Sequence, residues 1–254
     1  MKPKELNRYR MNKSRFWLSL LVSTTFIINS QAQDAVEEKS PWEKSASAGL
    51  TLTGGNADTV LFTANILATR KKGQNELSLG MNGAYGENGS TTINQSIEGF
   101  SQYNRLFSDH TFGYLRTQAI HDGIADVDYR LTIGPGGGHY FIKNDKTNLS
   151  AEFGPSFIYE QLGASASQGY LSVRIGETFT HKLSDRARLW QNVEFLPQVD
   201  DFNNFLVSGE IGVEADITEK MSLRTFIQDT YRNQPAPGRK SNDIKLVTAI
   251  GYKF

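Results

Sequence analysis

The 254-residue chain carries 27 basic and 27 acidic residues and no cysteine. Zero net charge gives no support for nucleic-acid binding, which normally leaves a basic surface. The missing cysteines exclude disulfides, thiolate metal sites, a cysteine nucleophile and a lipid-modified N-terminal cysteine. The length permits one or two domains, and a single all-β barrel can use nearly all of it.

The N-terminal segment has the layout of a signal peptide. A basic stretch over residues 1–15 precedes the apolar run at 16–28, which is too short to span a membrane as a helix. Ser30 and Ala32 are small residues with the spacing of a cleavage site, so we expect cleavage after Ala32 and a flexible lead over 33–41. Met11 is an alternative start, and an uncleaved membrane anchor is the competing interpretation.

Two classes of turn alternate along residues 42–254. Short polar turns, usually an acidic residue followed by a basic one, recur about every 36 residues, which indicates repeated hairpins. They lie at 70–77, 107–112, 143–149, 183–189 and 217–223. Breaks rich in Gly, Asn, Asp, Pro and Ser, which tolerate turn geometry, lie between them at 54–58, 87–90, 121–126, 161–168, 198–204 and 233–242. The resulting segments, roughly twelve, have about the length of a tilted membrane-spanning strand.

Apolar and polar residues alternate within these segments, as in the run DVDYRLTI at 126–133. A strand places successive side chains on opposite faces, and a soluble sandwich would alternate equally well. The dense charge on the polar face favours a transmembrane β-barrel, in which that face lines the interior. Because a strand in hydrocarbon must have every backbone group paired, we expect the barrel to be closed and antiparallel, with about 12 strands. We therefore predict one all-β outer-membrane barrel domain over residues 42–254.

Aromatic residues near the turns support this prediction, because barrels carry aromatic girdles at both membrane interfaces. One set comprises Tyr85, Tyr159, Phe205 and Tyr231, and the other comprises Phe107, Phe112 and Tyr252. The chain ends in LVTAIGYKF, where Tyr252 and Phe254 resemble the signal that outer-membrane proteins present to the barrel assembly machinery. With an even number of strands both termini lie on one side, and the short turns would then be periplasmic.

The run Gly134-Pro135-Gly136-Gly137-Gly138 suggests a phosphate-binding loop, but it lacks the Lys-Ser/Thr and the helix that such a loop needs. We interpret it instead as a bulge or bend in a strand, since Pro135 removes a backbone donor. Gly154-Pro155 is the expected neighbour across the hairpin.

Residues 126–160, DVDYRLTIGPGGGHYFIKNDKTNLSAEFGPSFIYE, resemble the signature of the YdiY-like salt-induced outer-membrane protein family, and WEKSASAGLTLTGGNADT at 42–59 resembles the start of the same domain. The resemblance covers nearly all of residues 42–254. It implies an outer-membrane barrel and supplies no reaction, ligand or catalytic residue.

Four scattered histidines, His110, His121, His139 and His181, show no metal-ligand spacing, so no metal or other cofactor is predicted. His121-Asp122 in one outer loop, with Ser165 and Ser167 in another, leaves open a membrane-embedded hydrolase acting on lipid or peptide. Solvated loop residues are the simpler interpretation.

The polar face is predicted to line the barrel interior. Its candidate residues are the acids Asp126, Asp128, Glu152, Glu160, Glu194, Glu210, Glu214 and Asp216, with the bases Arg130, Arg188, Arg224 and Lys245. These charges would either pair into a plug or line an acid-biased channel. Glu177 and Asp229 fall on the apolar face, which predicts bulges there.

The leading hypothesis is a narrow channel or an envelope structural protein linked to ionic or osmotic stress, without enzymatic activity. Its expected partners are outer-membrane lipid, the assembly machinery and small ions or solutes.

We expect the mature protein to begin at Gln33 and to fractionate with the outer membrane of a Gram-negative cell, because the leader and the aromatic terminus together indicate export and barrel assembly. Mass spectrometry of the mature protein and heat-modifiable migration on gels check this expectation. Recovery from the soluble periplasm, without heat-modifiable migration, would contradict it.

Overall fold

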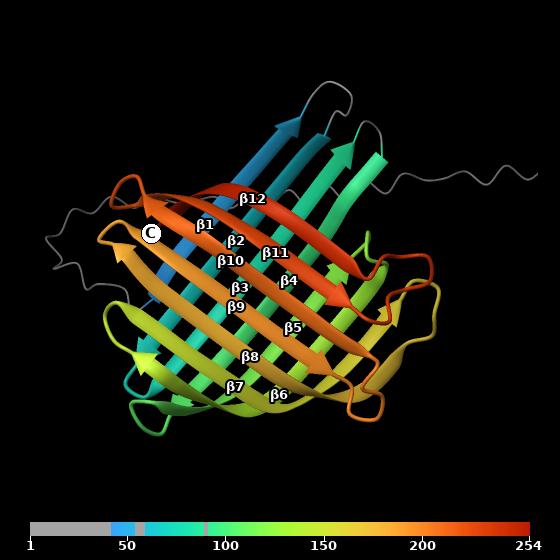
Figure 1. Ribbon diagram of the computed structural model, residues 1–254, viewed down its shortest axis with the longest axis horizontal. Helices are drawn as coiled ribbons and strands as arrows, with labels where there is room; N and C mark the ends of the chain where they lie inside the picture. The colour runs from blue at the N-terminus through green and yellow to red at the C-terminus, as the bar shows by residue number, and fades with distance from the viewer. Residues whose placement is uncertain (1–41, 54–58, 89–90) are drawn as a thin grey trace, which may run out of the picture. The chain divides into compact units, whose positions relative to one another are not determined.

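The computed structural model describes residues 42–53, 59–88 and 91–254. The predicted signal peptide (1–32), the lead (33–41) and the predicted break at 54–58 lie outside the described residues. Within these ranges no helix is long and apolar enough to cross a membrane. The described chain folds instead into antiparallel strands that close into a barrel (Figure 1).

Twelve strands form the barrel, so the prediction of a closed antiparallel barrel of about 12 strands is confirmed. They are β1 (Trp42–Thr53), β2 (Thr59–Lys72), β3 (Asn75–Asn88), β4 (Thr91–Leu106), β5 (Thr111–Asp122), β6 (Val127–Lys143), β7 (Thr147–Leu162), β8 (Gln168–Ser184), β9 (Ala187–Pro197), β10 (Phe205–Asp216), β11 (Met221–Arg232) and β12 (Asn242–Lys253). Each strand pairs with its neighbours in sequence, and β1 pairs with β12 to close the ring.

The predicted short turns connect β2 to β3, β4 to β5, β6 to β7, β8 to β9 and β10 to β11. They lie together at one end of the barrel, because consecutive antiparallel strands reverse direction at each connection. We call this end the short-turn end. The longer connections, such as 163–167 and 233–241, lie at the opposite end, which we call the long-connection end.

The alternating pattern separates an apolar outer face from a polar interior. On β6 and β7, Leu131, Ile133 and Phe157 are 45–49% exposed. The polar row faces inward, because Arg232 of β11 reaches Glu160 of β7, and side chains of non-adjacent strands can meet only inside a closed barrel. The outer face is therefore the apolar one.

The predicted aromatic girdles are largely on the outer face, with one exception. Tyr85, Tyr159, Tyr231, Phe107 and Tyr252 are all exposed apolar-face residues. Phe112 was wrongly assigned to the girdle, because it is 2% exposed and lies inside the barrel, where its ring is 5.2 Å from that of Tyr140. Phe112 shares parity with the inward Tyr114 and Arg116 of β5, so alternation along the strand places its ring inside although it lies near a turn.

The glycine-rich run does not form the predicted bulge. The register between β6 and β7 is the same at Ile133–Phe157 and at Gly137–Phe153, so no residue is inserted between them. The predicted neighbour is confirmed, since a Cβ on Gly154 would collide with Pro135. Pro135 and Pro155 oppose each other in this register. Because neither proline has an N–H to donate, the ladder loses a hydrogen bond without needing an extra residue.

Two glycines of this run, Gly136 and Gly138, make room for interior aromatic rings. The ring of Tyr114 on β5 lies directly over Gly136, where a Cβ would also stand 2.6 Å from the carbonyl oxygen of Phe153. The same pairing of an interior ring with a glycine on the neighbouring strand recurs for Phe112 with Gly138, Phe100 with Gly80 and Trp190 with Gly212. Glycine permits the close approach that lets rings lie flat against the wall.

The C-terminal strand closes the barrel against β1. Lys253 pairs with Ser45, and the backbone N–H of Phe254 donates to the carbonyl oxygen of Lys44. The rings of Tyr252 and Phe254 are 5.0 Å apart, and both are exposed on the outside. Their role as an assembly signal stays a prediction.

We expect Gly136→Ala to destabilise the folded barrel by about 1–3 kcal/mol, because the new methyl group must displace the Tyr114 ring or the β7 backbone. Gly137→Ala is the matched control, since the nearest atom to its Cβ is a carbonyl oxygen at 3.9 Å. Thermal unfolding in detergent, followed by heat-modifiable migration, measures both. Equal stability of the two variants would contradict the packing role of Gly136.

Candidate functional site

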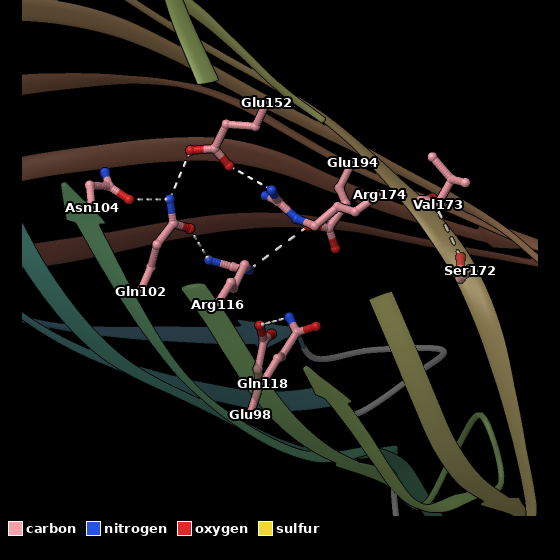
Figure 2. Close-up of polar contacts among 10 residues, drawn as sticks. All are labelled: Glu98, Gln102, Asn104, Arg116, Gln118, Glu152, Ser172, Val173, Arg174 and Glu194. Atoms are coloured by element: carbon pink, nitrogen blue, oxygen red, sulfur yellow. Dashed lines mark hydrogen bonds and ion pairs between the residues drawn. The ribbon is translucent and has the colours of Figure 1, made fainter. Parts of the chain in front are cut away.

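The charged side chains inside the barrel gather into clusters, and the central one bridges strands across the interior (Figure 2). Arg174 of β8 donates to Glu152 of β7 at 2.6 Å and to Glu194 of β9 at 2.5 Å. Gln102 of β4 donates to Glu152 at 2.8 Å, and Arg116 of β5 donates to the Gln102 oxygen at 3.1 Å. Arg116 also lies 3.9 Å from Glu194. These five residues form the central cluster.

A second cluster, the Glu160 cluster, lies toward the long-connection end. The Glu160 carboxylate is fully buried and accepts hydrogen bonds from Arg130 at 2.7 Å, Arg232 at 3.0 Å and Tyr170 at 3.0 Å. Arg130 is on β6 and Arg232 on β11, so the Glu160 carboxylate links two strands that are not neighbours in the sheet. Two guanidinium groups share one carboxylate here, which leaves the cluster with a positive excess.

The Glu214 cluster lies toward the short-turn end. Arg188 of β9 donates to Glu214 of β10 at 2.5 Å, and Arg224 of β11 lies 4.0 Å from the same oxygen. Nearby, Lys253 donates to Asp216 at 2.8 Å. Unlike the Glu160 cluster, the Glu214 cluster is accessible to solvent, since the side chain of Arg188 is 53% exposed.

Two interior carboxylates are bonded by neutral donors. Glu98 of β4 accepts from the Gln118 amide at 2.6 Å, and Glu210 of β10 accepts from the Trp190 indole at 2.6 Å. Among the described residues, neither carboxylate lies within the 4.0 Å ion-pair distance of a basic side chain. Their charges are therefore not compensated by a direct ion pair.

The interior is filled on one side and accessible to water on the other. Along β5 to β9 many inward side chains are buried, including Phe112, Ile158, Ser172 and Leu196. Along β2 and β3 they are partly or well exposed, including Asn65, Leu67, Ser78 and Asn82. The small inward residues Ser45 and Ser47 of β1, which are partly exposed, continue this wall. We call the wall formed by β1, β2 and β3 the open wall.

Most predicted interior residues lie in these clusters, but Glu210 and Lys245 do not, and nor do Asp126 and Asp128 at the edge. Asp126 sits in the connection between β5 and β6 with φ 59°, and it lies 3.6 Å from Arg239 of the connection between β11 and β12. Asp128 is exposed beside the register shift at the start of β6. Both lie at the long-connection end of the barrel. Asp126 precedes β6, which begins at Val127, and the register shift between Val127 and Tyr129 interrupts the alternation at Asp128.

The sequence interpretation missed three arginines that the interior uses, namely Arg116, Arg174 and Arg232. Each occupies a polar position in an alternating segment, so parity alone would have placed it inside. These arginines offset acids that the sequence had suggested were in excess.

Glu177 and Asp229 do lie on the outer face, but without the predicted bulges. The ladders on either side of each run through these positions in a constant register. Glu177 accepts a hydrogen bond from the Gln191 amide at 3.1 Å. The phase of the strands is unshifted, so these side chains are exceptions in an otherwise apolar face.

The residues considered for hydrolysis are bonded to other groups. His121 Nδ1 lies 2.8 Å from the carbonyl oxygen of Asp128, and the Asp122 carboxylate accepts from the backbone of Ala125. The Ser167 hydroxyl lies 2.7 Å from the Tyr129 hydroxyl. Across the described ranges, no group of acidic and histidine side chains is arranged to hold a metal ion.

An apolar outer face around a polar interior is the arrangement of transmembrane β-barrels, so the fold and the interior define a barrel of the outer-membrane type. Residues 46–254 match the family described as "Protein of unknown function, DUF481", and the chain belongs to that family. No curated protein matches the chain at a significant level.

The chain is similar to solved outer-membrane proteins at low sequence identity. The NanC porin aligns with a TM-score of 0.55 and 8% identity over 84% of this chain and 100% of its own. The translocator domain of the autotransporter NalP from Neisseria meningitidis aligns with a TM-score of 0.46 and 15% identity over 84% and 87% of the two chains. The outer-membrane channel DcaP of Acinetobacter baumannii aligns with a TM-score of 0.43 and 8% identity over 84% of this chain and 95% of its own. At these identities the similarity concerns the fold alone.

We expect Glu160→Gln to destabilise the barrel by about 3–5 kcal/mol, because it leaves Arg130 and Arg232 buried without their carboxylate. Asp216→Asn is the matched control and should cost less than about 1 kcal/mol, since both partners of its ion pair are partly exposed. Urea unfolding in detergent micelles measures both changes. Similar losses in the two variants would argue against a structural role for the Glu160 cluster.

Proposed function

We propose that this protein is a narrow outer-membrane channel for small ions and solutes, with its passage running along the open wall. The observation that carries the proposal is the uneven filling of the interior. Side chains close the β5–β9 side, whereas neutral and small residues on β1 to β3 stay accessible to water. The fold shared with outer-membrane proteins supports a location in lipid.

The interior supports a weaker charge selectivity than an acid-biased channel would have. Glu152, Glu160 and Glu194 are all engaged by arginines, so their fields are largely cancelled within the clusters. Glu98 and Glu210, which are bonded by neutral donors, are the carboxylates that would act on passing ions. We therefore propose a weak preference for cations that depends on these two side chains.

The proposed setting is ionic or osmotic stress, and it rests only on the resemblance of residues 126–160 to the salt-induced family. The proposed partners are outer-membrane lipid and the barrel assembly machinery, which would recognise Tyr252 and Phe254. A sealed structural barrel is the alternative, favoured by the extent of the ion-paired clusters.

We expect purified protein in planar bilayers to show small conductance steps with weak cation selectivity, which should fade as added salt screens the charges. The double variant Glu98→Gln, Glu210→Gln should bring the cation-to-anion permeability ratio close to one, because it removes the uncompensated charges.

Glu219→Gln is the matched control, since this exposed acid lies in the turn between β10 and β11 and should leave selectivity unchanged. A correctly folded protein that gives no conductance would refute the channel and favour the sealed barrel. Conductance with unchanged selectivity in the double variant would refute only the role of Glu98 and Glu210.

A further inference from the structure

The carboxylate of Glu177 lies on the outer face of the barrel. Glu177 of β8 follows the inward, buried Gly176 and lies in the same outward row as Ile175, which is 44% exposed. It pairs directly with Ala151 of β7 and Val193 of β9. Its side chain accepts a hydrogen bond from Gln191, which is also on the outer face.

Glu177 lies within the apolar band rather than at its edge. On the outward row of β8, Phe179, His181 and Leu183 separate it from the short-turn end, and Leu171, Val173 and Ile175 separate it from the long-connection end. Asp229, the other outward acid, lies instead close to the end of β11, where lipid headgroups and water begin. Polar groups within the band are costly and normally have a partner in protein.

The bond between Glu177 and Gln191 leaves hydrogen-bonding capacity unused. A carboxylate has about four acceptor sites, and a carboxamide offers a second N–H and an acceptor oxygen. In the hydrocarbon of the bilayer no water is present to form hydrogen bonds with these groups. The pair is self-complementary, because the amide supplies the donors that the carboxylate lacks.

The surface around the pair allows another backbone to approach closely. Ala151, Val193 and Gly209 occupy successive positions across β7, β9 and β10 in the row that contains Glu177. Small outward residues with a polar pair among them are characteristic of contacts between proteins inside membranes.

We propose that the outer face of β8 and β9, centred on Glu177 and Gln191, binds the same face of a second copy of this chain. A two-fold axis near Val193 brings Gln191 of each copy to Glu177 of the other, which makes the contact isologous. A second copy satisfies both groups at once, whereas an acyl chain satisfies neither.

The absence of native cysteine allows a direct test by thiol cross-linking. Val193→Cys, treated with a short bismaleimide in native outer membranes, should give a product of twice the subunit mass. Ile250→Cys on β12 is the matched control, because it is similarly exposed on the outer face of a different part of the barrel and should stay monomeric. Equal cross-linking of the two variants, or none for Val193→Cys, would overturn the proposal.

A second change tests the role of the carboxylate itself. In the Val193→Cys background, Glu177→Leu should reduce the cross-linked product by about tenfold, which corresponds to about 1.4 kcal/mol. Asp229→Leu should leave it unchanged, and heat-modifiable migration confirms that both variants fold. Undiminished cross-linking in Glu177→Leu, or a product whose mass shows a different partner, would refute the self-association through this pair.

Discussion

The pairing of β1 with β12 is the constraint on which the rest of this structure depends. Without that seam, two strands would expose unpaired N–H and C=O groups, each costing several kcal/mol in hydrocarbon. Among the described residues the seam is short, since its paired residues on β1 run from Ser45 to Gly49, whereas β1 pairs with β2 from Trp42 to Thr53. Closure gives the sheet an inside and an outside, and all other contacts follow from that division.

Inside the barrel, most of the described charged side chains share a partner of opposite charge. The guanidinium of Arg174 bonds carboxylates from both neighbouring strands, and Glu160 receives two guanidinium groups from opposite parts of the wall. Arginine suits this position because its planar fork donates in several directions. The clusters stiffen the β5–β9 side, while β1 to β3, with small and neutral side chains, contribute space.

Aromatic packing explains the glycine-rich run at 134–138, which the sequence suggested was a bulge or bend in a strand. The run at 134–138 resembles a ligand-binding loop in composition, yet two of its glycines stand under interior rings such as that of Tyr114. The two opposed prolines remove donors at the same level of the ladder, which avoids a bulge. The composition therefore reflects how tightly one wall packs rather than a binding function.

The sequence by itself determined the twelve strands, their antiparallel order and most side-chain faces, because turn chemistry and period-two alternation are local properties. It also placed Glu152, Glu160 and Glu214 on the polar face. Only the tertiary structure decided which charges meet, since Arg232 and Glu160 are separated by 72 residues and by several strands of the ring. Parity assigns a side chain to a face, but the stagger and curvature of the closed sheet decide what lies across from it.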